Sequence, residues 1–228
     1  GYFMVQPMDV LQSGRYLDDD CEDKYFDFIE ISTMNADIIL EESENGFRFD
    51  FNHDIFVVEL ESDELRIHQR NKDARNEEVR ICLPIGKKND VEIHTISGNV
   101  LVRRFIADYL EVKTVSGDIK VNDCTINELV IKTTSGLTNV YYGDIPFLEI
   151  ESVTGNAEVR GTDAKHILIH STCGNLKVGI LDEPDRYYTR VITKYSEEIR
   201  DRKDSTREVE VYTVSGEARI EFMTGDQL

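Results

Sequence analysis

The sequence predicts an all-β protein of the β-solenoid type, in which the chain winds through stacked coils of about 19 residues with two short strands each. Three observations indicate this fold. A phrase of the form Thr-x-Ser-Gly occurs six times, and five of its glycines, from Gly98 to Gly174, follow one another in steps of 19 residues. Apolar and polar residues alternate on both sides of each phrase, which is typical of strands with one buried face. This step also leaves no room for a crossover helix between parallel strands.

We call the repeated element the turn phrase, because its chemistry is that of a corner. Its hydroxyl, small and glycine positions are Thr95, Ser97, Gly98, Thr114, Ser116, Gly117, Thr133, Ser135, Gly136, Ser152, Thr154, Gly155, Ser171, Cys173, Gly174, Thr213, Ser215 and Gly216. Side chains in a strand alternate between its two faces. If Leu110 and Val112 point inward, we therefore expect the first hydroxyl of the phrase to point inward and the second to lie close to the inside. Buried hydroxyls need partners, and turn carbonyls of the same or the next coil supply them. Glycine provides either a positive φ or room for close backbone approach.

The chain begins with a lead-in, residues 1–25, that shows little pattern. Its acidic run at 18–23 lacks the spacing and the turn glycine of a calcium loop, so we interpret it as solvated. No charged-then-apolar signal segment stands at the start. Because the chain opens on Gly1 rather than Met, we expect that a signal or anchor has been removed.

Residues 26–90 are predicted to form irregular, antiparallel-leaning β coils. The stretch 29–40 resembles a decayed first copy of the repeat, with Asn35-Ala36 in place of Ser-Gly. Because Ala36 precedes Gly98 by somewhat more than three repeat steps, we expect intervening coils that are out of register with the period. Glu44-Asn45-Gly46 predicts a hairpin turn between two alternating runs.

Residues 91–180 are predicted to be the regular coils of the solenoid. The register breaks after Gly174, and a charged insertion at 181–207 carries the extra residues. Within the insertion the sequence predicts a strand at 187–195 and a short helix at 197–203, together forming a protruding hairpin or lid. Residues 208–228 are predicted to be the final coil and the C-terminal cap.

Charge and cysteine content limit the classes of partner and site. The chain of 228 residues carries 45 acidic and 26 basic residues, a net charge of −19, which opposes binding to nucleic acid or an anionic membrane. Its apolar runs are too short for a transmembrane segment. The cysteines, at positions 21, 82, 124 and 173, have no CxxC pairing, so we expect free thiols and no metal cluster. We interpret Cys173 as a small residue in a small slot.

No motif for catalysis, cofactor binding or metal binding stands out, so the sequence predicts no enzyme, no cofactor and no metal. The outward carboxylates Glu92 and Glu111 occupy one column of adjacent coils, near the separation used by retaining glycosidases. A plain surface column of charge is the simpler interpretation. His94 and His170 share an outward column, but four coils separate them, which is too far for a shared metal.

The pattern resembles the bacterial "putative adhesin" family of unknown function. The resemblance rests on the repeated turn phrases, on the leader 64–67 (Glu-Leu-Arg-Ile) and on the strand Val79–Pro84, and it covers residues 26–222. It implies a β-solenoid, often in proteins of the bacterial envelope, sometimes with a membrane anchor or a link to envelope-stress sensing. The family has no established catalytic residues to transfer. The insertion at 181–207 departs from the pattern, and we expect any particular specificity there.

These observations predict a non-catalytic, envelope-associated β-solenoid. We expect it to bind a protein or glycan partner of the envelope through an outward sheet face or the 181–207 insertion, with a role in envelope sensing. One alternative is a carbohydrate-active enzyme that uses Glu92 and Glu111. Another is a structural spacer or assembly module, whose solenoid ends need caps. The expected location is the cell envelope or the extracellular space, through an anchor outside this sequence, and a cytoplasmic location stays open.

Overall fold

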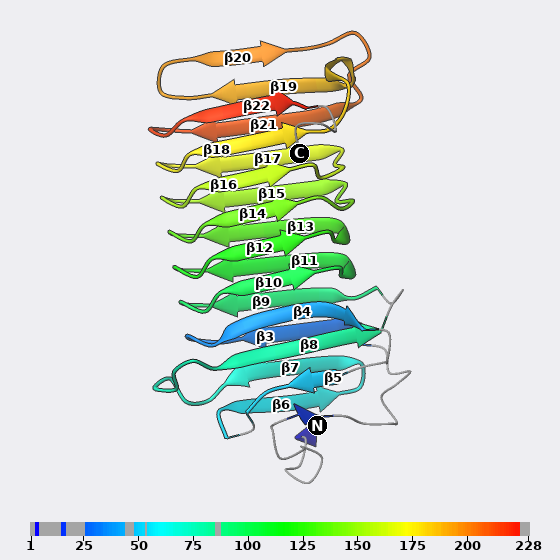
Figure 1. Cartoon of the computed structure of the whole chain (residues 1–228), viewed down its shortest axis with the longest axis vertical. Coiled ribbons are helices and arrows are strands. Elements are labelled where there is room, and N and C mark those ends of the chain that lie inside the picture. Colours follow the sequence, from blue (N-terminus) through cyan, green and yellow to red (C-terminus); the bar gives the residue numbers. More distant parts are fainter. Residues whose placement is uncertain are drawn as a thin grey trace.

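The computed structural model describes residues 3–4, 15–16, 26–43, 48–52, 54–84 and 88–223. The acidic run at 18–23, Cys21 and the turn at 44–46 lie outside these residues. Two β-sheets face each other along an elongated stack, as Figure 1 shows, and this confirms the predicted solenoid.

Sheet A has 12 strands and sheet B has 10. In spatial order sheet A consists of β1 (Phe3–Met4), β6 (Phe56–Glu61), β7 (Glu64–Gln69), β3 (Phe28–Ser32), β9 (Asp90–Thr95), β11 (Ile106–Thr114), β13 (Thr125–Thr133), β15 (Phe147–Ser152), β17 (His166–Ser171), β21 (Arg207–Thr213), β19 (Tyr187–Ile192) and β20 (Glu197–Arg200). Sheet B consists of β2 (Arg15–Tyr16), β5 (Arg48–Asp50), β8 (Glu78–Pro84), β4 (Asp37–Ser43), β10 (Val100–Arg103), β12 (Ile119–Asn122), β14 (Thr138–Tyr141), β16 (Ala157–Arg160), β18 (Leu176–Ile180) and β22 (Ala218–Phe222).

The regular coils stack in parallel with a register of one repeat. Leu110 of β11 pairs with Val91 of β9 on one side and Leu129 of β13 on the other. The inward side chains form the core: Leu110, Val112 and Ile131 are each 0% exposed. Burying such a column against both neighbouring coils is the main source of stability in a solenoid.

Each coil closes through a second corner that the turn phrase does not reveal. Arg104, Asp123, Tyr142 and Gly161 stand 19 residues apart, and all four have a positive φ, between 46° and 68°. A left-handed residue there reverses the chain from sheet B back to sheet A. Only the last of the four is glycine, so in the other coils a residue with a side chain adopts this unfavourable backbone conformation.

The segment between residue 40 and residue 91 does form a coil out of register with the period, but this coil does not lie between its sequence neighbours in space. Strand β3 pairs directly with β9, and β4 pairs directly with β10, so that Ile38 lies opposite Val100. The coil made by β7 and β8 lies on the far side of β3 and β4 instead. Spatial order and sequence order therefore differ here, because pairing follows complementary faces and not chain order.

The coils β3–β4 and β7–β8 stack in parallel, so the antiparallel pairing predicted for residues 26–90 is confined to the strands that finish the N-terminal end. In sheet A, β6 runs antiparallel to β7 and β1 antiparallel to β6. In sheet B, β5 runs antiparallel to β8 and β2 antiparallel to β5. Figure 1 shows these blue and cyan strands closing the stack at the end nearest the N-terminus.

The insertion at 181–207 is not a lid. After a 3₁₀ turn at Pro184–Arg186, strand β19 pairs in parallel with β21, and β20 pairs antiparallel with β19. The helix predicted at 197–203 is wrong, since Glu197–Arg200 is a strand. Because β21 lies between β17 and β19, the insertion extends sheet A beyond the last coil.

Strand β20 also carries charged side chains that prevent further strands from adding to the stack. Its register places Glu198 and Arg200 on the face that carries Val191 and Thr189 of β19. The regular coils have apolar side chains on this inward face. Charges at these positions prevent another apolar coil from adding, which is a known protection of edge strands. Sheet A is therefore capped by the insertion, not by the final coil as the sequence suggested.

Candidate binding face

The first hydroxyl of every turn phrase is buried. Exposed fractions run from 0% at Thr213 to 9% at Ser152. Thr114 donates from its hydroxyl to the Gly117 carbonyl at 2.8 Å, whereas Thr133 accepts from the Gly136 N–H at 3.0 Å. The Oγ1 atoms of Thr114 and Thr133 lie 2.8 Å apart. Successive coils therefore alternate between two hydrogen-bonding modes, and the hydroxyls are joined in pairs.

The same pairing recurs in both directions along the stack. The other paired hydroxyls are Thr33 with Thr95 and Ser152 with Ser171, each at 2.8 Å. Outside this column, the residue after glycine forms a second ladder. The N–H of Asp118 donates to Oδ1 of Asn99 at 3.0 Å, and the N–H of Asn175 to Oδ1 of Asn156 at 2.9 Å. Both ladders satisfy backbone groups and explain the recurring residue types without a ligand.

The phrase glycines are required for close approach and not for a positive φ. None of the six has a φ in the left-handed region. A Cβ on Gly117 would lie less than 3.0 Å from the Gly98 carbonyl oxygen, and a Cβ on Gly136 equally close to that of Gly117. From Gly117 onward, each glycine therefore rests on the carbonyl of the glycine below it, which any side chain would displace.

The second hydroxyl position is exposed, contrary to the parity expectation. Ser97, Ser116, Ser135 and Thr154 all point to solvent. Cys173 is exposed too, so it does not fill a small inner slot. Strand alternation ends at the first hydroxyl, because the chain already turns at the variable residue. Beside this position the variable residues form an exposed ridge: Ile96, Val115, Thr134, Val153, Thr172 and Val214.

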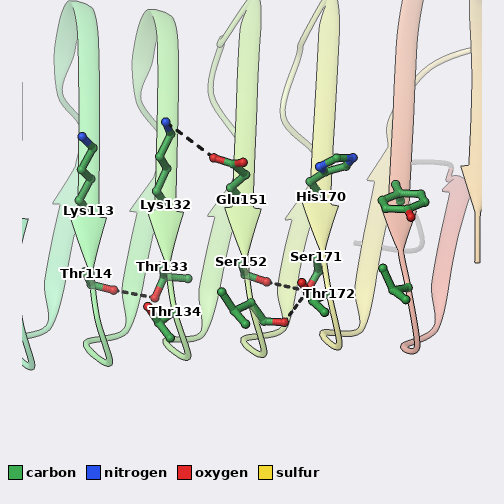
Figure 2. Close-up of a pocket in the computed structure, with 13 residues that line it drawn as sticks. Lys113, Thr114, Lys132, Thr133, Thr134, Glu151, Ser152, His170, Ser171 and Thr172 are labelled. Carbon is green, nitrogen blue, oxygen red and sulfur yellow. Dashed lines mark hydrogen bonds and ion pairs between the residues drawn. The ribbon is translucent and has the colours of Figure 1, made fainter.

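Two grooves lie on the outer face of sheet A. The first groove, of about 590 Å³, runs between this ridge and an outward column on β11 to β21. Figure 2 shows the column side chains in a row on successive strands, with a dashed line between Lys132 and Glu151. Those two charged groups lie 3.7 Å apart, and the rings of His170 and Tyr212 lie 4.8 Å apart. The groove offers cationic, anionic and aromatic contacts in sequence.

The second groove, of about 350 Å³, adjoins the first on β13, β15, β17 and β21. Phe147 and His166 stack at 5.0 Å with their rings 4° from parallel. Phe147 is 50% exposed and Leu168 39% exposed, beside the buried Val130. Four carboxylates line the same groove: Glu128, Glu149, Glu208 and Glu210. The sequence interpretation missed this site, although Glu128, Phe147 and His166 are spaced by 19 residues and so had to share an outward column.

The proposed catalytic pair is adjacent but not prepared for acid catalysis. Glu111 and Glu92 are register partners on β11 and β9. The Lys113 ammonium lies 2.7 Å from Glu111, and the Tyr109 hydroxyl donates to Glu111 at 2.7 Å. Lys113 chiefly, together with Tyr109 and against the effect of partial burial, holds the pKa of Glu111 below its usual range. A glycosidase acid needs a raised pKa, so the environment of Glu111 does not favour that role.

The remaining candidate groups stay apart. His94 and His170 lie in one column on β9 and β17, with three strands between them. No group of three or more His, Cys, Asp or Glu side chains in the described part of the chain could hold a metal ion. The described cysteines are free thiols, and burial raises the pKa of Cys82 to about 11 and that of Cys124 to about 12. The described residues contain no helix long and apolar enough to span a bilayer.

Comparisons with known proteins agree with this architecture. A family model described as Toastrack DUF4097 matches residues 26–227. No curated protein matches the chain. A crystal structure of a putative adhesin from Bacteroides fragilis NCTC 9343 is 14% identical, with a TM-score of 0.51, and the match covers 88% of this chain and 93% of that one. This likeness shows the fold alone.

Two other crystal structures are similar at a lower level. A putative lipid binding protein from Parabacteroides distasonis ATCC 8503 is 16% identical, with 88% of this chain and 93% of that chain covered and a TM-score of 0.46. A putative cell adhesion protein from Clostridium sporogenes ATCC 15579 is 13% identical, with 97% of each chain covered and a TM-score of 0.34.

Proposed function

The chain belongs to the Toastrack DUF4097 family, and from this premise we propose that it is a non-catalytic binding module of the cell surface or extracellular space. It holds a protein or glycan partner on the outer face of sheet A. The observation that carries the proposal is the pair of adjoining grooves on that face. The proposal extends to this chain the adhesive role in the name of a putative adhesin of the same fold.

The face has the composition of a binding surface. Aromatic and apolar side chains are exposed beside charged groups, and such mixed surfaces mark interaction sites in soluble proteins. The first groove combines Lys113, Lys132 and His170 with the ring of Tyr212. These groups suit hydrogen bonding and ring stacking with a polar partner.

The insertion is a weaker candidate for the partner site. Its strands β19 and β20 continue sheet A, and Tyr187 packs inside the molecule against Phe222 at 5.5 Å between ring centroids. Deleting 183–205 would therefore remove a cap as well as a surface. Point substitutions on the outer face separate these two effects.

The test compares the two outer faces with matched residue types. The sheet A variant is Lys132→Ala with Tyr212→Ala, and the sheet B control is Lys177→Ala with Tyr141→Ala. Binding is measured on a panel of immobilised glycans and extracellular proteins, after thermal unfolding has shown that both variants are folded. We expect the sheet A variant to lose at least about tenfold in affinity and the control to keep the wild-type value. Loss in the control, or no loss in the sheet A variant, contradicts the proposal.

The enzymatic alternative has its own test. Glu111→Gln removes the carboxylate that the catalytic interpretation requires. The proposal expects no hydrolysis of a glycan panel by the wild-type protein above the level of the variant. A wild-type rate that falls at least about a hundredfold in Glu111→Gln would establish the enzyme instead. A spacer without a partner would bind nothing on either panel.

A further inference from the structure

We propose that the second groove binds an extended segment of a partner protein in which an apolar residue stands between two basic residues, in the pattern basic-x-apolar-x-basic. This inference rests on the proposed function and names the chemistry of one partner. It follows from the order of side chains along two outward columns of sheet A.

The first column places two rings between two carboxylates along the stack. In register order it consists of Glu128, Phe147, His166 and Glu208, one residue from each of β13, β15, β17 and β21. The stacked rings of Phe147 and His166 therefore lie between two carboxylates. Neighbouring strands are about 4.8 Å apart, so the two glutamates are separated by roughly 14 Å along the stack.

The second column lies beside the first and alternates apolar and acidic side chains. It consists of Val130, Glu149, Leu168 and Glu210. Val130 is almost fully buried, whereas Leu168 remains accessible next to the ring pair. The two columns together form an apolar centre with negative charge at both ends and on one side.

Three of the four groove carboxylates have no cationic partner among the described residues. Among the described residues, none of Glu128, Glu149 and Glu210 has a Lys, Arg or His nitrogen within 4.0 Å, whereas His166 Nδ1 lies 3.7 Å from Glu208. Elsewhere on sheet A, acids such as Glu111 and Glu151 are paired with lysines. The unpaired charge makes this groove complementary to a cationic ligand.

Charge alone does not explain the site, because the whole protein is acidic. The distinguishing feature is the exposed apolar surface of Phe147 and Leu168. A ligand that carried only positive charges would leave this surface exposed to solvent. A Lys or Arg side chain over Phe147 gains a cation–π contact as well as the carboxylate. In an extended chain, residues four apart are about 13 Å apart, which matches the distance between the two glutamates.

The test uses three short peptides that differ in one feature each, with the whole chain of residues 1–228 as the receptor. The first carries Lys-Ser-Leu-Ser-Lys, the second Lys-Ser-Ser-Ser-Lys and the third Glu-Ser-Leu-Ser-Glu. Binding is followed by amide chemical-shift changes in NMR. We expect shifts confined to the second groove with the first peptide, affinity at least about tenfold lower with the second, and no shifts with the third.

Matched variants separate the apolar and the charged contributions. Phe147→Ser with Leu168→Ser is compared with Ile96→Ser and Val115→Ser, which replace apolar residues on the turn ridge that are at least as exposed as their counterparts. Glu149→Gln with Glu210→Gln is compared with Asp73→Asn and Glu198→Gln, which remove the same charge elsewhere. Only the groove variants are expected to weaken the first peptide, each by at least about tenfold.

Three results would overturn the inference. They are equal affinity for the first and second peptides, equal loss in the control variants, and binding of a neutral glycan at Phe147 with no peptide binding there. If the first peptide does not bind in the second groove while binding to the glycan and protein panel still depends on Lys132 and Tyr212, the inference is wrong and the proposed function stands. If panel binding does not depend on sheet A, the proposed function falls.

Discussion

The regular coils from β9 to β18 and the two coils before them in space, β3–β4 and β7–β8, are made of the same kind of strand but are held together differently. In the regular coils the turn backbone itself stacks, with glycine resting on glycine carbonyl. In the N-terminal pair, side chains replace the missing backbone contacts. The difference shows that identical stacked turns satisfy each other through their backbones. Where the turns are not identical, side chains must provide the contacts instead.

Gln69 is the clearest replacement. Its Oε1 accepts from the backbone N–H groups of Met34 (2.9 Å), Asn35 (3.2 Å) and Ala36 (3.2 Å), and its Nε2 donates to Asn71 O at 2.7 Å. A lower coil with its own turn phrase would provide these acceptors from its backbone. Ala36 stands at the glycine position of this coil, because no glycine carbonyl lies below it.

Glu41 performs a similar role in sheet B. Its carboxylate accepts from Arg80 of β8 at 2.8 Å and from Arg103 of β10 at 2.7 Å, so one group links three strands. Those strands come from three separate stretches of the sequence. Partial burial would raise the pKa of Glu41, but the hydrogen bonds and charges of Arg103 and Arg80 outweigh it, and the pKa lies below its usual range.

The largest expected effect comes from breaking the backbone stack. Gly117→Ala places a methyl group against the Gly98 carbonyl, where the coils cannot separate without losing strand pairing. We expect a loss of at least about 3 kcal/mol in the free energy of unfolding, measured by urea denaturation. Ala36→Gly is the control and should cost only about 1 kcal/mol, because glycine gives the unfolded chain more conformational freedom. Similar losses in both variants would contradict the comparison.

A smaller loss in the free energy of unfolding is expected when Gln69, which replaces the stacked turn backbone, is changed. Gln69→Leu keeps the volume but leaves three backbone N–H groups of residues 34–36 without their acceptor. Each buried orphan is costly, so the free energy of unfolding should fall by about 2–3 kcal/mol in urea denaturation. Gln69→Glu retains the acceptor oxygens and should recover part of the loss. Full stability in Gln69→Leu would show that the turn is satisfied by water.

The ion-pair link should contribute less and should depend on pH. Glu41→Gln is expected to cost about 1.5–2 kcal/mol at neutral pH, because charged hydrogen bonds become neutral ones. The folded-state pKa is lowered, so this stabilisation is present above the unfolded-state pKa and is lost as pH falls through the folded-state pKa. Urea denaturation of both proteins from pH 7 to pH 3 should show the difference shrinking. A constant difference would exclude the ion pair as its cause.

The smallest effect is expected within the regular coils. Thr133→Val removes one paired hydroxyl at nearly constant volume, and the Gly136 N–H loses its acceptor. We expect a loss of about 1 kcal/mol in the free energy of unfolding. Ser135→Ala, at the exposed position of the same phrase, should change it by less than about 0.5 kcal/mol. The reverse order would mean that the exposed hydroxyl supports the turn.

Much of the fold could be predicted because a constant repeat length determines which residues lie side by side in adjacent coils. Once the repeat step is known, Leu110 must lie beside Val91 and Leu129, and alternation decides which side chains are inside. The position of β3 could not be predicted this way. Its long separation from β9 in the sequence conceals a direct contact, because an intervening segment can leave the stack and pack elsewhere.

The binding face was only partly predictable. The outward column of Glu92 and Glu111 follows from spacing, and so does the column of Phe147 and His166, which the sequence interpretation did not use. The pairing of Glu111 with Lys113 and the lack of a partner for Glu149 depend on side-chain directions that no spacing gives. The strand at Glu197–Arg200 escaped prediction because its four exposed residues have no apolar alternation.

The position of β21 between β17 and β19 has a consequence for synthesis and for the length of the protein. A chain emerging from the ribosome reaches β19 and β20 before the strand that joins them to the stack exists. The edge of β17 therefore stays open until residues 207–213 arrive, and it is the vulnerable point of the nascent chain. In the same way, β3 and β4 precede the coil that lies outside them. Both ends of the stack are built out of sequence order, so a whole coil is inserted or removed with least rearrangement among the regular coils between them.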